Sequence, residues 1–74
     1  MKKNELLNII NEILENKGEK KIQVLDDAID LRKDLNFSSL DLAELTVKIE
    51  DITGVDIFED GLVSTIKEIN EKLP

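Results

Sequence analysis

Helical spacing of apolar residues is the feature that most constrains this chain, because it recurs in three separate stretches. Between residues 4 and 16 the apolar positions fall three and four residues apart, and the same spacing returns after Ser38 and after Thr65. Such spacing places apolar side chains on one face of a helix. The pattern predicts an all-α fold with three main helices. Their buried faces would carry Leu6, Leu7, Ile9, Ile10, Ile13 and Leu14 in the first, Leu42, Leu45, Ile49 and Ile52 in the second, and Ile66, Ile69 and Leu73 in the last.

The ends of the first and last helices carry residues typical of helix boundaries. Asn4 is a candidate N-cap, and Gly18 stands just past the last apolar residue of the first stretch. Thr65 lies three residues before Glu68, the spacing of a capping box. We therefore expect a first helix over residues 4–16 and a last helix that begins after Thr65.

The second helix has the clearest boundaries. Ser38 lies three residues before Asp41, which forms a capping box with Asp in place of the usual Glu or Gln. Phe37, just before the cap, is spaced to pack on Leu42 as a hydrophobic staple. Gly54 is suited to end the helix.

Two connections link these helices. Residues 17–37 form a long first loop without sustained periodicity, and its apolar positions should pin it to the core: Ile22, Val24, Leu25, Ile29, Leu31 and Leu35. Residues 55–63 form a shorter connection around Val55, Ile57 and Leu62, in which we expect one short helical turn. The chain is thus predicted to be a single domain, 1–74, folded as a small four-helix bundle of three main helices and one short one.

Charge and composition exclude several classes of function. Ten Lys and Arg against seventeen Asp and Glu give a net charge of −7, which disfavours nucleic acid and anionic membrane and favours partners with basic patches. No stretch is apolar enough for a signal core or a membrane span, so we expect a cytoplasmic monomer. Charge alone is equally compatible with a role in solubility.

Catalysis by this chain is not expected. It has no His and no Cys, so neither a Ser–His nor a Cys–His pair can form. Its carboxylate pairs are neighbours in sequence, in stretches that look exposed. A calcium loop starting at Asp51 would need oxygen ligands where Thr53 and Val55 stand. We predict no catalytic residue and no metal site.

Residues 34–45 carry a more specific pattern. Ser38-Ser39-Leu40-Asp41 is preceded by Leu35-Asn36 and followed by Glu44-Leu45. This resembles the acyl carrier protein family, in which Asp-Ser-Leu-Asp/Glu opens the second helix after a Leu-Gly turn and is followed by Glu-Leu. In the same register, Ile49-Glu50-Asp51, Gly54-Val55-Asp56-Ile57 and Thr65-Ile66 resemble the family's Leu-Glu-Glu, Gly-Val-Glu-Ile and Thr-Val, so the resemblance covers about the whole chain.

The resemblance implies a non-catalytic carrier that is itself the substrate of partner enzymes. The family bears 4'-phosphopantetheine on the serine that corresponds to Ser39, joined through a phosphodiester, and holds acyl groups on it as thioesters. The physical interpretation agrees: if Ser38 is the N-cap, Ser39 is the first helical residue, where unpaired N–H groups and the helix dipole favour a phosphate. An arm of this kind would also supply the thiol that a chain without Cys lacks. The alternative is that the two serines only start a helix.

Partners implied by the resemblance are a phosphopantetheinyl transferase and enzymes with basic patches, such as an acyl-ACP synthetase (ACP, acyl carrier protein), acyltransferases or ketosynthases. The family presents the outer face of its second helix to them, with an apolar contact beside acidic side chains. An ordinary solvated helix face is the alternative. Here the corresponding residues are Leu40, Asp41, Ala43, Glu44, Val47, Glu50 and Asp51.

The chain departs from the family pattern at four places. Ser38 replaces Asp but can still cap the helix. Asn36 replaces Gly, and Asn is the next-best residue after Gly where φ is positive. Lys48 puts a positive charge in the acidic helix, and Ile52-Thr53 replaces a polar residue followed by Phe. The last two departures concern which partners the chain serves.

The cargo stays open between related alternatives. Fatty-acid, polyketide and aminoacyl or peptidyl carriers share this architecture, and the Asp-Leu-Ala-Glu-Leu run favours an acyl carrier of fatty-acid, polyketide or related lipid metabolism. Lys48 and the short connection before Thr65 favour a specialised carrier. An unmodified helical interaction module is the alternative from a different class.

Overall fold

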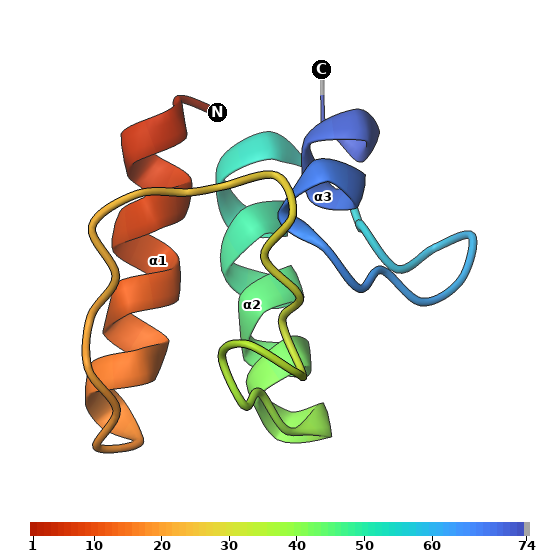
Figure 1. The fold of residues 1–74 in the computed structure, drawn as a ribbon. Coiled ribbons are helices and arrows are strands. Elements are labelled where there is room, and N and C mark those ends of the chain that lie inside the picture. The colour runs from red at the N-terminus through yellow and green to blue at the C-terminus, as the bar shows by residue number, and fades with distance from the viewer. Residues whose placement is uncertain (74) are drawn as a thin grey trace.

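The structure is a computed structural model that describes residues 1–73, and within them the regular elements are three helices (Figure 1). They are α1 (Lys3–Asn16), α2 (Ser39–Thr53) and α3 (Ile66–Lys72). The predicted all-α class is confirmed for this part of the chain. Pro74, the last residue of the predicted domain, lies outside the described residues.

Helix α1 starts earlier than predicted. Its N-cap is Lys2 and not Asn4, which lies inside the helix. The reason is Glu5, whose carboxylate Oε1 accepts a hydrogen bond from the backbone N–H of Lys2 at 3.0 Å. A side chain three residues into the helix thus satisfies the backbone ahead of it, as the second half of a capping box does.

The predicted stop of α1 at Gly18 is confirmed. Gly18 has φ of +78°, and its N–H donates to the carbonyl of Glu15 at 3.1 Å. The N–H of Glu19 reaches back to the carbonyl of Leu14 at 2.8 Å. These two bonds form a Schellman motif, which needs a residue in the left-handed region and favours Gly there.

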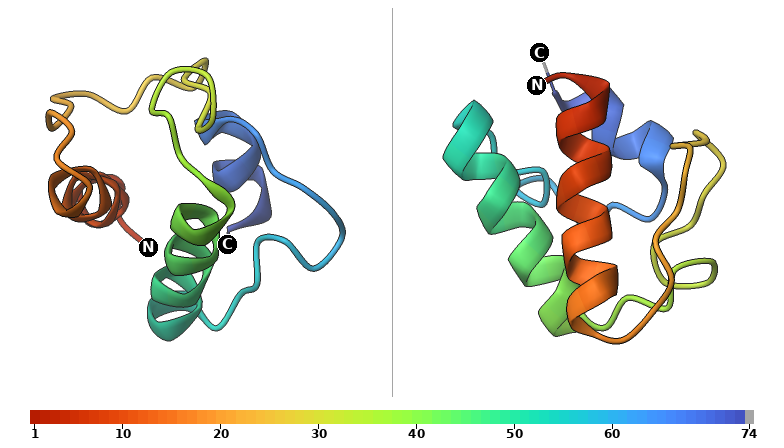
Figure 2. Two further views of the ribbon diagram at one scale, coloured as in Figure 1. Left: turned by 90° about the horizontal axis from the view of Figure 1, so that it is seen from below. Right: turned by 90° about the vertical axis from the view of Figure 1, so that its left-hand side faces the viewer.

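Helices α1 and α2 lie side by side and run in opposite directions, as both views agree (Figures 1 and 2). α1 therefore ends where α2 begins, at the lower end of Figure 1, although residues 17–38 separate them in sequence. This arrangement lets side chains from the end of α1 reach the start of α2.

One hydrophobic cluster joins the helices and the loops. Leu45 and Ile49 of α2 are fully buried, as predicted, whereas Ile52 is 51% exposed, so its predicted place in the core is wrong. Leu7 and Leu73 are only partly buried against the cluster. The cluster consists of Leu6, Ile9, Ile10, Ile13, Leu14, Leu25, Leu31, Leu35, Phe37, Leu42, Leu45, Ile49, Ile57, Val63, Ile66 and Ile69.

The first loop is pinned to the core, as predicted, with one exception. Leu25, Leu31 and Leu35 are buried, but Val24 is 70% exposed. Backbone hydrogen bonds also fix the loop to the start of α3. The N–H of Leu31 donates to the carbonyl of Ser64 at 2.8 Å, and the N–H of Ile66 donates to the carbonyl of Ile29 at 3.0 Å.

The short fourth helix is not formed: residues 57–60 are turns. The carboxylate of Asp56 accepts from the N–H of Phe58 at 2.9 Å, and the N–H of Glu59 donates to the Asp56 carbonyl at 3.2 Å. Gly61 has φ of +135°, which breaks any helical continuation. Ile57 is buried as an anchor, whereas Leu62 is 80% exposed.

Among residues 1–73, no helix is long and apolar enough to cross a membrane.

Candidate functional site

Ser39 is the first residue of α2, and its side chain has no part in capping the helix. The N-cap is Ser38, whose Oγ accepts from the Asp41 N–H at 3.2 Å, while Asp41 Oδ2 accepts from the Ser38 N–H at 2.8 Å. The predicted capping box is therefore confirmed. Ser39 is exposed, and its N–H and that of Leu40 have no hydrogen-bond acceptor within residues 1–73. An exposed hydroxyl thus stands beside donors that favour an anion.

A tight turn sets the start of the helix. Asn36 has φ of +56°, so it adopts the left-handed conformation expected of a Gly substitute. The residues on either side of it, Leu35 and Phe37, are both buried. Phe37 and Leu42 belong to the same cluster, as the predicted staple requires. These anchors fix the position at which Ser38 and Ser39 enter the helix.

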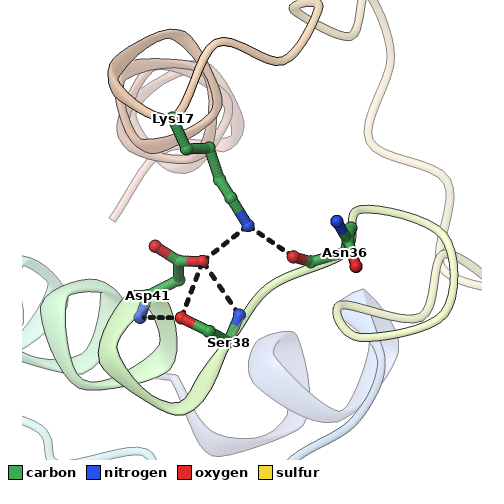
Figure 3. A network of polar contacts seen from close by, with 4 residues as sticks. All are labelled: Lys17, Asn36, Ser38 and Asp41. Carbon is green, nitrogen blue, oxygen red and sulfur yellow. Dashed lines mark hydrogen bonds and ion pairs between the residues drawn. The ribbon is translucent and has the colours of Figure 1, made fainter.

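Lys17, at the C-terminal end of α1, reaches across to the start of α2 (Figure 3). Its Nζ donates to Asp41 Oδ2 at 2.7 Å and to the backbone carbonyl of Asn36. The same Nζ lies 5.6 Å from the centre of the Phe37 ring, a cation–π distance. Both charged side chains are mostly covered, with 22% of Lys17 and 17% of Asp41 exposed. The network therefore ties α1, the turn and the capping box together.

The same network sets the protonation of Asp41. Burial alone raises the pKa of this carboxyl, but hydrogen bonds from Lys17 and Ser38 favour the charged form and outweigh burial. The net result is a pKa below the ordinary value of 3.8. Asp41 is thus a charged structural acceptor, and its Oδ2 is engaged on the inner side of the helix start. The sequence predicted Asp41 on the exposed recognition face, whereas only 17% of its side chain is exposed.

Arg32, in the first loop, contacts Ser39 itself. Its Nη2 donates to Ser39 Oγ at 3.4 Å. The carboxylate of Asp30 holds the backbone there, because its Oδ1 accepts from the N–H groups of both Arg32 and Lys33 at 2.9 Å. Sequence reasoning missed this residue, since a loop has no periodicity to place its side chains. The available signal was that Arg32 is the only arginine and lies seven residues before Ser39.

A shallow groove of about 280 Å³ opens beside Ser39. Asp56 holds one wall of it against α2, because its Oδ1 accepts from Thr46 Oγ1 at 3.2 Å as well as from the Phe58 N–H. The wall it holds carries the turn at residues 57–60. The groove is lined by Arg32, Ser39, Leu42, Ala43, Thr46, Phe58 and Leu62. An exposed serine, a cation and an apolar channel thus meet at one place.

The outer face of α2 is apolar along its centre. Leu40 is 82% exposed and Val47 is 58% exposed, with the exposed Ala43 on the same side. Glu50 and Asp51 are exposed in the last turn of the helix, where negative charge opposes the helix dipole. Helix stability therefore does not account for this pair of acids.

Glu44 is less available than its neighbours. It is half-buried, and its carboxylate lies 4.0 Å from Nζ of Lys48, which also donates to Glu12 of α1 at 3.0 Å. The hydrogen bond with Glu12, followed by the charges around it, raises the pKa of Lys48. Lys48 therefore bridges α1 and α2, a role that its place in the sequence did not reveal.

No group of three or more His, Cys, Asp or Glu side chains that could hold a metal ion occurs in the part of the chain that the structure describes. Comparisons with protein-family models, with curated proteins and with solved structures find no match to this chain. A function must therefore be proposed from its residues and their geometry.

Proposed function

We propose that this chain is an acyl carrier protein that bears 4'-phosphopantetheine on Ser39. The observation that carries the proposal is the exposed hydroxyl of Ser39 at the first position of a capped helix, beside an arginine and an apolar groove. A serine that caps a helix accepts a hydrogen bond from a backbone N–H, and here Ser38 does so. Ser39 is thus accessible to an enzyme without cost to the helix.

The residues around Ser39 fit the group that the proposal requires. A phosphodiester carries one negative charge, and unpaired backbone N–H groups at a helix start together with a guanidinium favour that charge. The arm beyond the phosphate is long and partly apolar, and the groove of about 280 Å³ lies next to the attachment point. When bound, the arm supplies a thiol on which acyl groups are held as thioesters. The chain itself would supply attachment, orientation and recognition.

The proposal includes the architecture of a carrier domain. In it, the turn at residues 57–60 stands where we expected the short helix of a four-helix bundle. Ile57 anchors this segment in the core, so it can form a groove wall without helical hydrogen bonds. The protein would act as a cytoplasmic monomer.

Partner enzymes would approach the outer face of α2. Leu40, Ala43 and Val47 offer an apolar contact, and Glu50 and Asp51 offer charge to a basic patch. Charges at the rim of an interface mainly raise the association rate and exclude wrong partners. The partners would be a phosphopantetheinyl transferase and the acyltransferases, ketosynthases or acyl-ACP synthetase of fatty-acid, polyketide or related biosynthesis.

The test is the intact mass of the protein after incubation with coenzyme A, Mg²⁺ and a phosphopantetheinyl transferase of broad specificity. We expect a gain of one phosphopantetheine on each chain. An unchanged mass, with a known carrier modified in the same tube, would contradict the proposal and favour an unmodified interaction module.

A further inference from the structure

Two cationic side chains, Lys17 and Arg32, lie near the start of α2, and within the described residues only Lys17 forms an ion pair. Lys17 is bound by Asp41 and by the Asn36 carbonyl. Arg32 has no ion pair within residues 1–73, although the chain has seventeen Asp and Glu residues. Its one side-chain hydrogen bond in that range goes to Ser39 Oγ, at 3.4 Å. The exposed guanidinium thus lies beside the Ser39 hydroxyl with its other N–H groups available to an anion.

Hydrogen bonds to neighbouring residues fix the backbone around Arg32. Asp30 Oδ1 binds the N–H of Arg32, and the N–H of Asp30 in turn donates to Asp34 Oδ2 at 2.7 Å. The neighbouring Leu31 is fully buried and bonded to Ser64. The loop therefore presents Arg32 from a rigid base toward the start of α2.

Any phosphate attached to Ser39 Oγ would have its other oxygens within reach of this side chain. Those oxygens are only two bonds from Oγ, and a guanidinium presents a planar set of donors that matches a phosphate. We infer that Arg32 binds the phosphodiester of the group attached to Ser39 and thereby positions the arm along the groove between α2 and the turn at residues 57–60. This inference rests on the proposed function.

The location of Arg32 gives the arm a direction. Arg32 lines the groove together with Ser39, Phe58 and Leu62, whereas Lys17 does not line it and has its Nζ already bound to Asp41. An ion pair with Arg32 would hold the phosphate on the groove side. It would also offset the negative charge that modification adds to a chain of net charge −7.

The experiment is a cycle that combines modification of Ser39 with substitution of Arg32. Four proteins are compared, each before and after modification with excess transferase: the parent, Arg32→Gln, Arg32→Lys and the control Lys33→Gln. Lys33 is exposed, adjacent and of the same charge, but within the described residues the side-chain hydrogen bond to Ser39 comes from Arg32 and not from Lys33. The readouts are the melting temperature and the ³¹P chemical shift of the phosphodiester.

We expect the change in melting temperature on modification to be lower by about 3 °C in Arg32→Gln than in the parent, the size typical of one exposed charge pair in a domain of this length. Lys33→Gln should match the parent, and Arg32→Lys should fall between, since it keeps the charge and loses the planar donors. The ³¹P shift should move in Arg32→Gln and stay in Lys33→Gln.

If Arg32→Gln and Lys33→Gln respond alike in both readouts, the inference is overturned while modification of Ser39 stands. If the parent itself gains no mass, the proposed function fails and the inference fails with it. The mass measurement thus separates the two failures.

Discussion

The two sides of the start of α2 are built from similar materials and differ in how completely they are paired. On the side that faces α1, Lys17, Ser38 and Asp41 form a hydrogen-bonded network in which the two charged side chains are mostly covered (Figure 3). On the groove side, Arg32 and Ser39 share one long hydrogen bond and face solvent. The network of Lys17, Ser38 and Asp41, which we call the paired side, fixes the start of the helix. Arg32 and Ser39, which we call the open side, are not needed for this. The difference indicates where stability resides and where a ligand can be attached.

The largest effect on stability should come from breaking the paired side. Asp41→Ala removes the acceptor of Lys17 and half of the capping box, and it leaves a mostly covered cation unpaired. We expect a loss of about 2 kcal/mol in the free energy of unfolding and a melting temperature lower by about 10 °C. Thermal unfolding followed by circular dichroism measures it. Asp51→Ala is the control, on the same helix but exposed, and should change stability by less than about 0.5 kcal/mol. Equal stability of the two variants would show that the network is not structural.

The next effect concerns recognition on the open side and should appear in a rate. Reversing Glu50 and Asp51 to Lys should slow modification by the transferase about tenfold at low salt, because long-range attraction acts on the approach. It should not unfold the helix, since positive charge suits its C-terminal turn. Glu44 is left unchanged because it contacts Lys48.

The matched control for this reversal carries the same change of charge on other helices, with Glu15 and Glu71 replaced by Lys. Glu15 pairs with Lys21 at 3.3 Å, but both side chains are exposed, so the loss of this pair should change stability little. Both double variants are assayed at several salt concentrations. The parent rate should fall with salt and converge on that of the α2 variant, because screening removes only the attraction that was present. Equal slowing by the two variants would mean that net charge, and no particular face, sets the rate.

The smallest effect is the pH dependence of the paired side. The pKa of Asp41 is lowered in the folded state, so its charged form contributes stability that is full above the unfolded value near 3.8 and is lost as the pH falls through the lowered folded value. Asp41→Asn lacks this titration. The stability difference between parent and variant in urea should therefore be constant at neutral pH and shrink in acid. A difference that stays constant down to the acid limit of folding would contradict the assigned pKa direction.

Much of the helical framework could be predicted because its determinants are local. Ser38 with Asp41, Thr65 with Glu68, and Gly18 act within a few residues of the helix ends, and each is confirmed. The start of α1 was misplaced because Asn4 has a higher N-cap preference than Lys2, yet Glu5 reached the Lys2 backbone.

The remaining errors share a physical cause: periodicity identifies a face but not what covers it. Ile52 continues the apolar spacing of α2, yet no element covers it, and it is exposed. The predicted short helix is only a turn over residues 57–60 because Gly61, with φ of +135°, stops the helical continuation. Arg32 and Lys17 could not be placed, since each acts on a residue brought near only by the fold.

The most direct test of the central claim is the site of modification. The parent, Ser38→Ala and Ser39→Ala are each incubated with coenzyme A, Mg²⁺ and transferase, and their intact masses and far-ultraviolet circular dichroism are measured. We predict that the parent and Ser38→Ala each gain one phosphopantetheine, although Ser38→Ala loses about 1 kcal/mol of stability with its N-cap. Ser39→Ala should keep its helical content and gain nothing. Two results would contradict the division between a structural Ser38 and a functional Ser39: a mass gain by Ser39→Ala, or an unchanged mass in a Ser38→Ala variant that is folded.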